Sequence, residues 1–293
     1  MAEVNELIGG YTLKTLLQTG AASQVFEVVE PKSRVHYAMK ILLPEHADNK
    51  EHRGMLFHEF EIGQKMRHIN VVNIQKLSRD EKNPHFIMEY FPAGSLRKRL
   101  MSKDPRDKTF LKNNAKKIFR EMATGLAYMN SSGYVHRDVK PDNILVNESG
   151  ATKIIDFAIT KKIEKSFLQK LMRKRGSAAG THSFMSPEQI RNEIIDGRAD
   201  IYSYGVTLFE LVCGRLPFRG ATRDDLLRKH LIEKPPPVTT FNEDVTDEFS
   251  NFLLKLMMKK REDRLPNFHE VMIAMKKLRV FKSVVEQDDE EHH

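Results

Sequence analysis

The sequence contains a single cysteine, Cys213, among its 293 residues. One cysteine excludes an intramolecular disulfide and any zinc site built from cysteines, and it favours a reducing, cytoplasmic setting. The sequence also lacks an apolar run close to the roughly 20 residues that a membrane-spanning helix needs. Its N-terminus lacks the charged, apolar and small-residue regions of a secretory signal. We therefore expect a cytoplasmic location and no membrane contact by this chain.

Charged residues are abundant and slightly unbalanced, with 48 Lys and Arg against 40 Asp and Glu, which leaves a net charge of +8. This excess favours anionic partners but does not choose among nucleotides, acidic proteins, nucleic acids and anionic lipids. The basic clusters Arg97–Arg99 and Lys259–Arg261 are interpreted as solvated helix ends, so no nucleic-acid partner is expected. The length permits one large domain or two smaller ones.

The periodicity of apolar residues changes along the chain. Between Tyr11 and Tyr90, short alternating segments indicate strands, interrupted by one helix over about Gly54–Arg67. From Phe110 onward helical spacing dominates, and Ile201–Val212 is apolar nearly all round, as expected of a helix inside a core. The predicted strands are Tyr11–Leu17, Val25–Val29, Val35–Leu42 and His85–Tyr90.

The predicted strand Val35–Leu42 carries the first candidate residue for chemistry. Alternation places Ala38 and Lys40 on one face of this strand. An ammonium group beside a small side chain suits a phosphate next to an adenine-sized slot, although a surface lysine on an edge strand would show the same pattern. A carboxylate partner favours the phosphate interpretation, and Glu59 and Glu61 on the following helix are both candidates.

Three later segments carry a family resemblance. His136–Asn143 (H-R-D-V-K-P-D-N) matches the catalytic-loop pattern H-R-D-x-x-x-x-N, and Asp156–Ala158 (D-F-A) stands where the metal-binding D-F-G is expected. Phe184–Gln189 (F-M-S-P-E-Q) resembles the motif that closes an activation segment. The chain therefore resembles the eukaryotic-type serine/threonine protein kinases, most of all the bacterial members, from about Tyr11 to about Arg279.

The resemblance implies a fold of the α+β class, the two-lobed protein kinase fold. The β-rich N-lobe is expected over residues 1–91 and the mainly helical C-lobe over residues 92–283, with a hinge near Phe91–Ser95 and ATP bound between the lobes. Residues 284–293, rich in Asp and Glu, are expected to form a disordered acidic tail. Many bacterial relatives of this kind are membrane receptors, so the chain could be the cytoplasmic domain of a longer receptor.

The same resemblance implies the reaction: transfer of the γ-phosphoryl group of ATP, with Mg²⁺, to Ser or Thr hydroxyls of proteins. Asp138 would be the catalytic base, and Lys140 would steady the transferred group. Glu59 would hold Lys40 towards the phosphates, because its spacing to His68 is that of the family.

Further site residues are carried over by position. Asn143 and Asp156 would bind Mg²⁺, and the nucleotide would be contacted by Gly20, Val25, Ala38, Lys40 and the backbone of Glu89 and Phe91. Two structural pairings are also implied. Asp200 would brace the catalytic loop, and Arg264 would pair with Glu188.

Two departures from the family pattern leave an alternative open. In the loop Gln18–Val25 only Gly20 and Val25 match the glycine-rich pattern. This loop, which would cover the nucleotide, should therefore be stiffer than in the family or should lie further from the nucleotide. Ala158 replaces the usual glycine and should hinder inversion of the Asp156 segment. The alternatives to a protein kinase are a pseudokinase scaffold that binds nucleotide weakly and a kinase-fold enzyme acting on a small molecule.

Regulation is expected at Arg137, which could bind a phosphate on the activation segment. Ser177, or alternatively Ser166, is the expected site of autophosphorylation, whereas Thr181 should contact Asp138 and Lys140. The stretch between Ile159 and Gly176 is strongly basic and could dock an acidic protein or the acidic tail. The oligomeric state is left undecided by the sequence.

Overall fold

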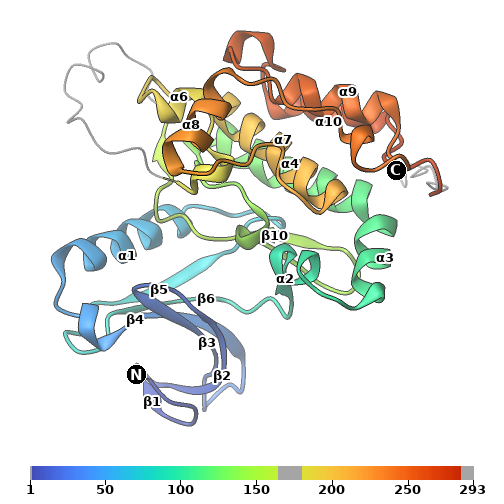
Figure 1. The fold of residues 1–293 in the computed structure, drawn as a ribbon. Coiled ribbons are helices and arrows are strands. Elements are labelled where there is room, and N and C mark those ends of the chain that lie inside the picture. The colour runs from blue at the N-terminus through green and yellow to red at the C-terminus, as the bar shows by residue number, and fades with distance from the viewer. Residues whose placement is uncertain (1, 164–179, 285–293) are drawn as a thin grey trace. The chain divides into compact units, whose positions relative to one another are not determined.

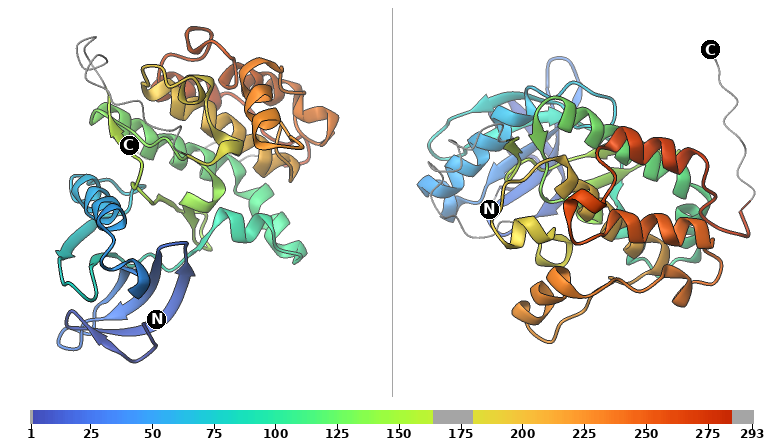
Figure 2. Two further views of the ribbon diagram at one scale, coloured as in Figure 1. Left: turned by 60° about the vertical axis from the view of Figure 1, so that its left-hand side comes forward. Right: turned by 90° about the horizontal axis from the view of Figure 1, so that it is seen from above.

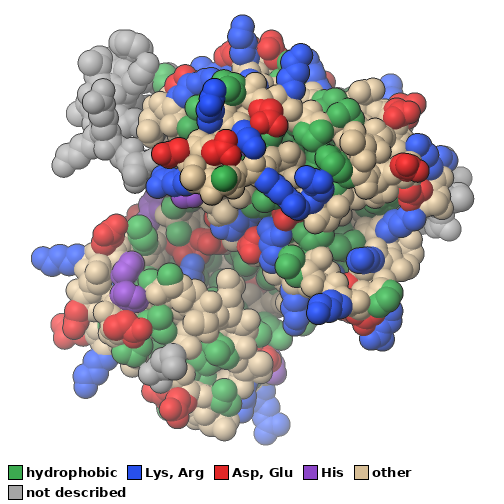
Figure 3. Space-filling model, viewed as in Figure 1, with side chains coloured by type: hydrophobic (Ala, Val, Ile, Leu, Met, Phe, Trp, Pro, Cys, Tyr) green, Lys and Arg blue, Asp and Glu red, His purple; other side chains and the backbone are tan. Residues whose placement is uncertain are grey.

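The structure is a computed structural model that describes residues 2–163 and 180–284. The chain divides into two compact units, Met1–Ala93 with Lys153–Thr160, and Gly94–Thr152 with Lys161–His293. Each unit is described separately. On the face drawn in Figure 3, Lys and Arg side chains are spread over both units with acidic side chains between them.

The first unit is built on an antiparallel sheet in the order β1-β2-β3-β4-β6-β5. Its strands are β1 (Leu7–Ile8), β2 (Tyr11–Thr19), β3 (Ser23–Val29), β4 (His36–Leu42), β5 (Ile74–Ser78) and β6 (His85–Glu89). One face of the sheet buries Phe26, Met39 and Ile41 together with residues of β1, β2 and β6. Helix α1 (Lys50–Gly63) packs against β4, β5 and β6 (Figure 1).

The helix expected over Gly54–Arg67 lies four residues earlier, at Lys50–Gly63. Asn49 sets its start, because its side chain accepts hydrogen bonds from the N–H groups of Glu51 and His52. The first turn is polar and largely exposed, so the apolar spacing that marks a helix in the sequence does not report it.

Residues 153–160, expected within the C-lobe, instead belong to the first unit. Strand β10 (Thr152–Ile154) crosses the boundary, and Ile154 forms a parallel bridge with Val71. The N–H of Val72 donates to the carbonyl of Ile154 at 2.9 Å, and the N–H of Ile154 donates to Asn70 at 2.8 Å. These backbone bonds attach the segment that carries Asp156 to the unit that carries Lys40.

The second unit is mainly helical and is organised around α7 (Gly197–Cys213), which packs against α4 and α9 (Figures 1 and 2). Asp196 caps the start of α7, and Gly214 ends it in the left-handed conformation. Among the described residues of this unit, the other helices are α2 (Leu96–Leu100), α3 (Pro105–Asn113), α4 (Ala115–Ser131), α6 (Pro187–Ile190), α8 (Arg223–Ile232), α9 (Asp247–Leu256) and α10 (Phe268–Lys276).

Short strands and single turns complete the second unit and carry the loop of interest. Strand β7 (Gly94–Ser95) pairs with β9 (Ile144–Val146), and β8 (Tyr134–Val135) pairs with β11 (Lys161–Lys162). The His136–Asn143 loop therefore runs between β8 and β9, and its last three residues form a 3-10 turn, Pro141–Asn143. A second 3-10 turn, His182–Phe184, precedes α6.

Candidate functional site

One face of the sheet in the first unit presents the residues expected to contact a nucleotide. Val25 on β3 pairs with Lys40 on β4, so their side chains share a face, and Ala38 lies two residues before Lys40 on the same side. The neighbouring residues point to the opposite, core face, which explains why this strand alternates. The face carries one ammonium group between two small apolar side chains.

Lys40 and Glu59 form an ion pair, with 2.6 Å between the Lys40 Nζ and a Glu59 carboxylate oxygen. Glu59 is 4% exposed on the inner side of α1, whereas Glu61 is exposed, so helical geometry selects Glu59. Asp156 lies 3.9 Å from the same ammonium. These contacts bring Lys40, Glu59 and Asp156 together within the first unit.

For Lys40 and for Glu59, burial and the charge of the partner shift the pKa in opposite directions. Burial would lower the pKa of Lys40, but the carboxylates of Glu59 and Asp156 raise it overall, so the ammonium stays charged at neutral pH. Burial raises the pKa of Glu59 to about 7, while Lys40 opposes that shift. The Lys40 ammonium therefore supplies a positive charge on the sheet face, held in place by Glu59, as a phosphate contact requires.

The D-F-A segment is held against α1. The Asp156 backbone adopts a left-handed φ of +68°, and its carboxylate accepts the N–H of Ala158 at 3.2 Å. Phe157 is fully buried beside Gly63 of α1. The carbonyl of Thr160 lies 2.8 Å from Nε2 of His58, next to Glu59. Ala158 itself is not among the residues with positive φ, so a methyl group fits this backbone without strain.

The altered glycine-rich loop forms a tight connection between β2 and β3. The N–H of Gly20 donates to the Ser23 carbonyl at 2.8 Å, and the Ala22 carbonyl accepts the N–H of Leu43 at 2.9 Å. Gly20 does not use a positive φ, and a Cβ there would make only ordinary contacts. Nothing in this connection calls for the missing glycines, and it leaves Val25 on the sheet face.

Glu89 ends β6, and Phe91 lies two residues further along the chain. The Glu89 side chain contacts Lys153 at 2.9 Å and accepts the N–H of Asn73 at 2.8 Å. The Glu89 N–H donates to the Asn73 carbonyl at 3.0 Å, so a contact between Glu89 and an adenine would use the Glu89 carbonyl. The ring of Phe91 lies 5.8 Å from the Lys153 ammonium.

In the second unit, Asp138, Lys140 and Thr181 meet directly. The Lys140 ammonium donates to Asp138 at 2.7 Å and to the Thr181 hydroxyl at 2.5 Å. The N–H of Thr181 donates to the other Asp138 oxygen at 2.9 Å. The side-chain amide of Asn143 donates to both the backbone and the carboxylate of Asp138, at 2.9 and 3.0 Å. Two residues of the loop, Lys140 and Asn143, together with Thr181 thus fix the Asp138 carboxylate from three sides.

The buried carboxylate of Asp200 holds the backbone at the start of the His136–Asn143 loop. Asp200, fully buried on α7, accepts the N–H of His136 at 2.9 Å and the N–H of Arg137 at 2.8 Å. Asn130 donates to Asp200 at 3.1 Å. Burial raises the pKa of Asp200, whereas these donors and His136 oppose the shift. The Arg137 backbone has a φ of +73°, which the two bonds to Asp200 help to hold.

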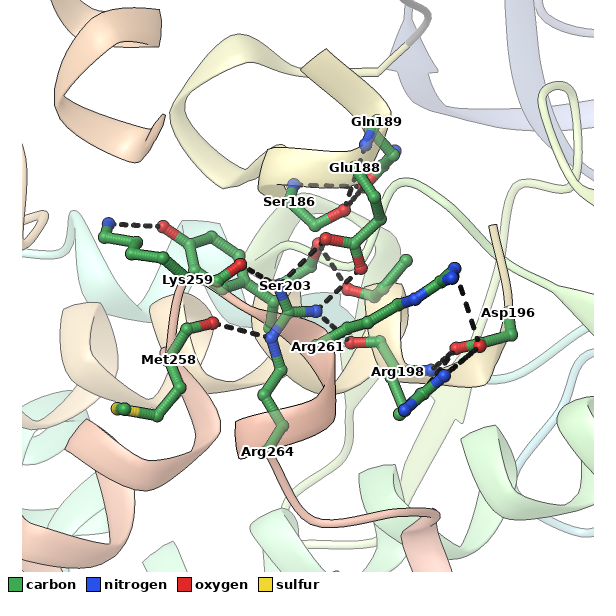
Figure 4. A network of polar contacts seen from close by, with 12 residues as sticks. Ser186, Glu188, Gln189, Asp196, Arg198, Ser203, Met258, Lys259, Arg261 and Arg264 are labelled. Carbon is green, nitrogen blue, oxygen red and sulfur yellow. Dashed lines mark hydrogen bonds and ion pairs between the residues drawn. The ribbon is translucent and has the colours of Figure 1, made fainter. Parts of the chain in front are cut away.

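Figure 4 shows the network around the S-P-E-Q motif, in which Glu188 accepts two hydrogen bonds from Arg264. Gln189 lies on the same short helix and reaches the Arg137 carbonyl at 2.8 Å. The sequence interpretation assigned Gln189 no role. The spacing Ser186-x-x-Gln189 is nevertheless that of a capping box, which is the local signal that could have drawn attention to this side chain.

The expected regulatory residues are only partly described. Thr181 makes the contacts given above, and Arg137 is 6% exposed. Ser166, Ser177 and most of the basic stretch lie outside the described residues, as do residues 285–293 of the acidic tail.

The donor set suits Mg²⁺ in each unit. Asp156 presents carboxylate oxygens, and Asn143 uses its amide nitrogen on Asp138, which leaves its amide oxygen for a metal. Within residues 2–163 and 180–284 no cluster of three or more His, Cys, Asp or Glu side chains could hold a metal by itself. Mg²⁺ commonly binds one or two protein oxygens and completes its shell with phosphate and water, so a sparse set is compatible with it.

Comparison with known proteins places these residues in a family context. The model of the protein kinase domain matches residues 11–275. A probable serine/threonine-protein kinase of Clostridium acetobutylicum is 27% identical over 288 residues, which cover 96% of this chain and 41% of the relative. The serine/threonine-protein kinase PrkC of Bacillus subtilis is 27% identical, with 86% of this chain and 38% of PrkC covered.

A third relative, the probable serine/threonine-protein kinase PknB of Lactococcus lactis, is 30% identical over 71% of this chain and 32% of its own length. The chain therefore spans only about two fifths or less of these relatives. In the two ranges that the structure describes, no helix combines the length and apolar character needed to span a bilayer.

Proposed function

This chain belongs to the protein kinase domain family, and on that premise we propose that it transfers the γ-phosphoryl group of ATP to Ser and Thr hydroxyls of proteins. The relatives named above carry serine/threonine-protein kinase names, which supports this substrate class. Because the chain spans a minor part of those relatives, the activity is proposed for the domain described here.

The observation that carries the proposal is the contact set of Asp138. Its two oxygens face Lys140 and the backbone of Thr181, and its position is fixed by Asn143. A carboxylate held this way can orient an acceptor hydroxyl and take its proton, while the neighbouring ammonium of Lys140 stabilises the charge on the transferred group.

The first unit supplies the nucleotide contacts in this proposal. The ammonium of Lys40, held by Glu59, binds phosphate oxygens, and Val25 and Ala38 line the adenine side of the same face. The Glu89 carbonyl and the Phe91 N–H are the proposed adenine partners. Asp156 and Asn143 would hold Mg²⁺, which when bound neutralises part of the charge on the phosphates.

The pseudokinase alternative depended on the altered glycine-rich loop and on Ala158. The contacts above give it no support, since Lys40 keeps its partner Glu59 and Asp138 keeps Asn143 and Lys140. The small-molecule alternative gains no support from the relatives, whose names are those of protein kinases.

The test compares phosphate incorporation from labelled ATP into the protein itself and into a generic protein substrate. Asp138→Asn keeps the shape but removes the base, and we expect kcat to fall on the order of 10²–10⁴-fold. Asp48→Asn, an identical change at an exposed position, should leave kcat unchanged. Equal incorporation by wild type and Asp138→Asn would indicate a contaminating kinase and overturn the proposal.

Autophosphorylation of the activation segment is proposed as the regulatory step, with Ser177, or alternatively Ser166, as acceptor and Arg137 as the phosphate-binding residue. An acidic protein, or the chain's own acidic tail, is the proposed partner of the basic stretch. Mass spectrometry of the purified active protein should find phosphate on residues 156–188. Full activity without phosphate on this segment would contradict the proposed step.

A further inference from the structure

The side-chain amide of Gln189 lies between two backbone groups of opposite polarity. Its oxygen accepts the N–H of Ser186 at 3.1 Å and the Ser186 hydroxyl at 3.0 Å, and its nitrogen donates to the Arg137 carbonyl at 2.8 Å. A backbone N–H can only donate and a carbonyl can only accept, so these partners determine which way the amide points. Gln189 is 1% exposed.

Of the two polar atoms of this amide, only the oxygen is needed by helix α6 itself. The capping box at the start of α6 uses the Gln189 oxygen as an acceptor, and a glutamate at this position would serve equally well. The amide nitrogen is not required by the helix. It is the atom that reaches the His136–Asn143 loop, 52 residues away in the chain. The choice of glutamine over glutamate is therefore explained by the contact with Arg137.

The Arg137 peptide groups need support from both ends. Arg137 has a φ of +73°, a conformation that costs a non-glycine residue free energy unless its surroundings hold it. Asp200 binds the Arg137 N–H from one side, and Gln189 binds the carbonyl from the other. The carbonyl of Arg137 and the N–H of Asp138 belong to the same peptide plane, so fixing this carbonyl orients the backbone of Asp138.

Gly180 covers the hydrogen bond between Gln189 and Arg137. A Cβ on this residue would lie 3.1 Å from the Arg137 carbonyl oxygen and 3.6 Å from the Gln189 amide nitrogen, so the Gly180 backbone passes directly over their hydrogen bond. Its φ of +126° is one that glycine adopts readily. The next residue, Thr181, contacts both Asp138 and Lys140. The bond between Gln189 and Arg137 is thus shielded from water where the three segments meet.

We propose that Gln189 is a positioning residue for phosphoryl transfer. Its amide donates to the Arg137 carbonyl and so holds Asp138 in register with the backbone of Thr181, coupling the end of the activation segment to the catalytic base. This role rests on the kinase function proposed above. In this role the buried Gln189 acts through the backbone of Arg137 and not by direct contact with nucleotide or substrate.

The variant Gln189→Glu separates the two halves of the amide. It keeps the acceptor of the capping box but, when ionised, directs a carboxylate oxygen at the Arg137 carbonyl. Burial and that facing oxygen favour the neutral form, and a protonated carboxyl can again donate to the carbonyl. We therefore expect the kcat of the variant to be about 10- to 100-fold lower than that of wild type near pH 8. Near pH 6 the two kcat values should approach each other.

Three comparisons make this test specific. The KM for ATP should stay near the wild-type value, because the nucleotide contacts are not altered. Gln75→Glu, the same substitution at an exposed position of β5, should show a flat kcat ratio near unity. Ser186→Ala weakens the capping box but keeps the donor to Arg137, so it should lower the melting temperature without changing the pH profile.

A kcat ratio near unity at every pH would overturn the positioning role, and so would a ratio that is low but independent of pH. Should Gln189→Glu fail to fold near pH 8, Gln189→Leu has a similar shape without charge or donor, and its kcat must then fall at least about tenfold at an unchanged KM.

A measurement without turnover distinguishes failure of this role from failure of the kinase function. Hydrogen exchange of the amides of Arg137 and Asp138 should be faster in Gln189→Glu than in wild type near pH 8, with the difference reduced near pH 6. If wild type transfers no phosphate but this exchange difference is present, the kinase function is wrong and the positional coupling stands. An unchanged exchange rate would overturn the coupling itself.

Discussion

Glu188 and Arg264 form a two-pronged ion pair in which the arginine side chain is completely inaccessible to solvent and the glutamate is 3% exposed. The same guanidinium donates to the carbonyls of Met258 at 2.7 Å and Arg198 at 2.7 Å (Figure 4). Arg264 thereby satisfies its donors in the interior and ties α6 to the segment that follows α9.

We predict that Glu188→Gln lowers the free energy of unfolding by about 3–5 kcal/mol, because it leaves the Arg264 charge buried without a counter-charge. Urea unfolding followed by circular dichroism would measure this change. Glu262→Gln removes a carboxylate from the exposed pair with Arg261 and should change stability little. Similar effects of the two substitutions would mean that burial of the Glu188 pair has no energetic consequence.

Two glycines of α1 should respond to alanine in opposite directions. A Cβ on Gly63 would lie 2.3 Å from Ile74 Cδ1 and 3.0 Å from the Phe157 ring, so Gly63→Ala should destabilise by about 1–3 kcal/mol. A Cβ on Gly54 meets nothing within 4 Å, so Gly54→Ala should stabilise by roughly 0.5–1 kcal/mol through helix propensity. Thermal unfolding of both variants would test this. Equal effects would mean that α1 does not pack on Ile74 as described.

His230 should make stability fall at acidic pH. Burial, with Lys259 nearby, lowers the pKa of His230 to about 3, whereas an unfolded histidine titrates near 6.5. Between these two pKa values the unfolded state binds a proton at this histidine and the folded state does not. The stability that is fully present above pH ~6.5 is therefore lost as the pH falls towards 3. Between pH ~7 and ~5 this group should account for about 2 kcal/mol.

The check is urea unfolding of wild type and His230→Gln at both pH values. The variant should lose about 2 kcal/mol less than wild type between them. His269→Gln, at an exposed histidine, should keep the wild-type pH dependence. His85, whose pKa is also lowered by burial, contributes in the same direction and should remain visible in His230→Gln. A pH dependence identical to that of wild type in His230→Gln would contradict this account.

Ala158 is predicted to be favourable for stability. Its φ is not positive, so glycine offers no relief of strain in the described conformation. Ala158→Gly should instead lower the free energy of unfolding by about 0.4–1 kcal/mol, because glycine increases the freedom of the unfolded chain. Thermal unfolding would measure the change. A gain in stability would show that the alanine is strained where it stands.

Much of the fold follows from local patterns. Alternation in Val35–Leu42 places Lys40 and Ala38 on one face, because neighbouring side chains of a strand point to opposite sides. The apolar character of Ile201–Val212 predicts the buried helix α7. The bounds of α1 were predicted less well, since its first turn is polar and is defined by a cap at Asn49.

The sequence by itself determined the chemistry available to this protein: the ammonium of Lys40, the carboxylates of Asp138 and Asp156, and the short segments that present them. Only the tertiary structure decided which groups meet. It paired Lys40 with Glu59, the partner that the spacing to His68 had predicted, attached residues 153–160 to the first unit, and brought the Gln189 amide to the Arg137 carbonyl. Periodicity and capping act over a few residues, and a capping box accepts Gln and Glu alike. A contact across 52 residues is set by the packing of segments distant in the chain.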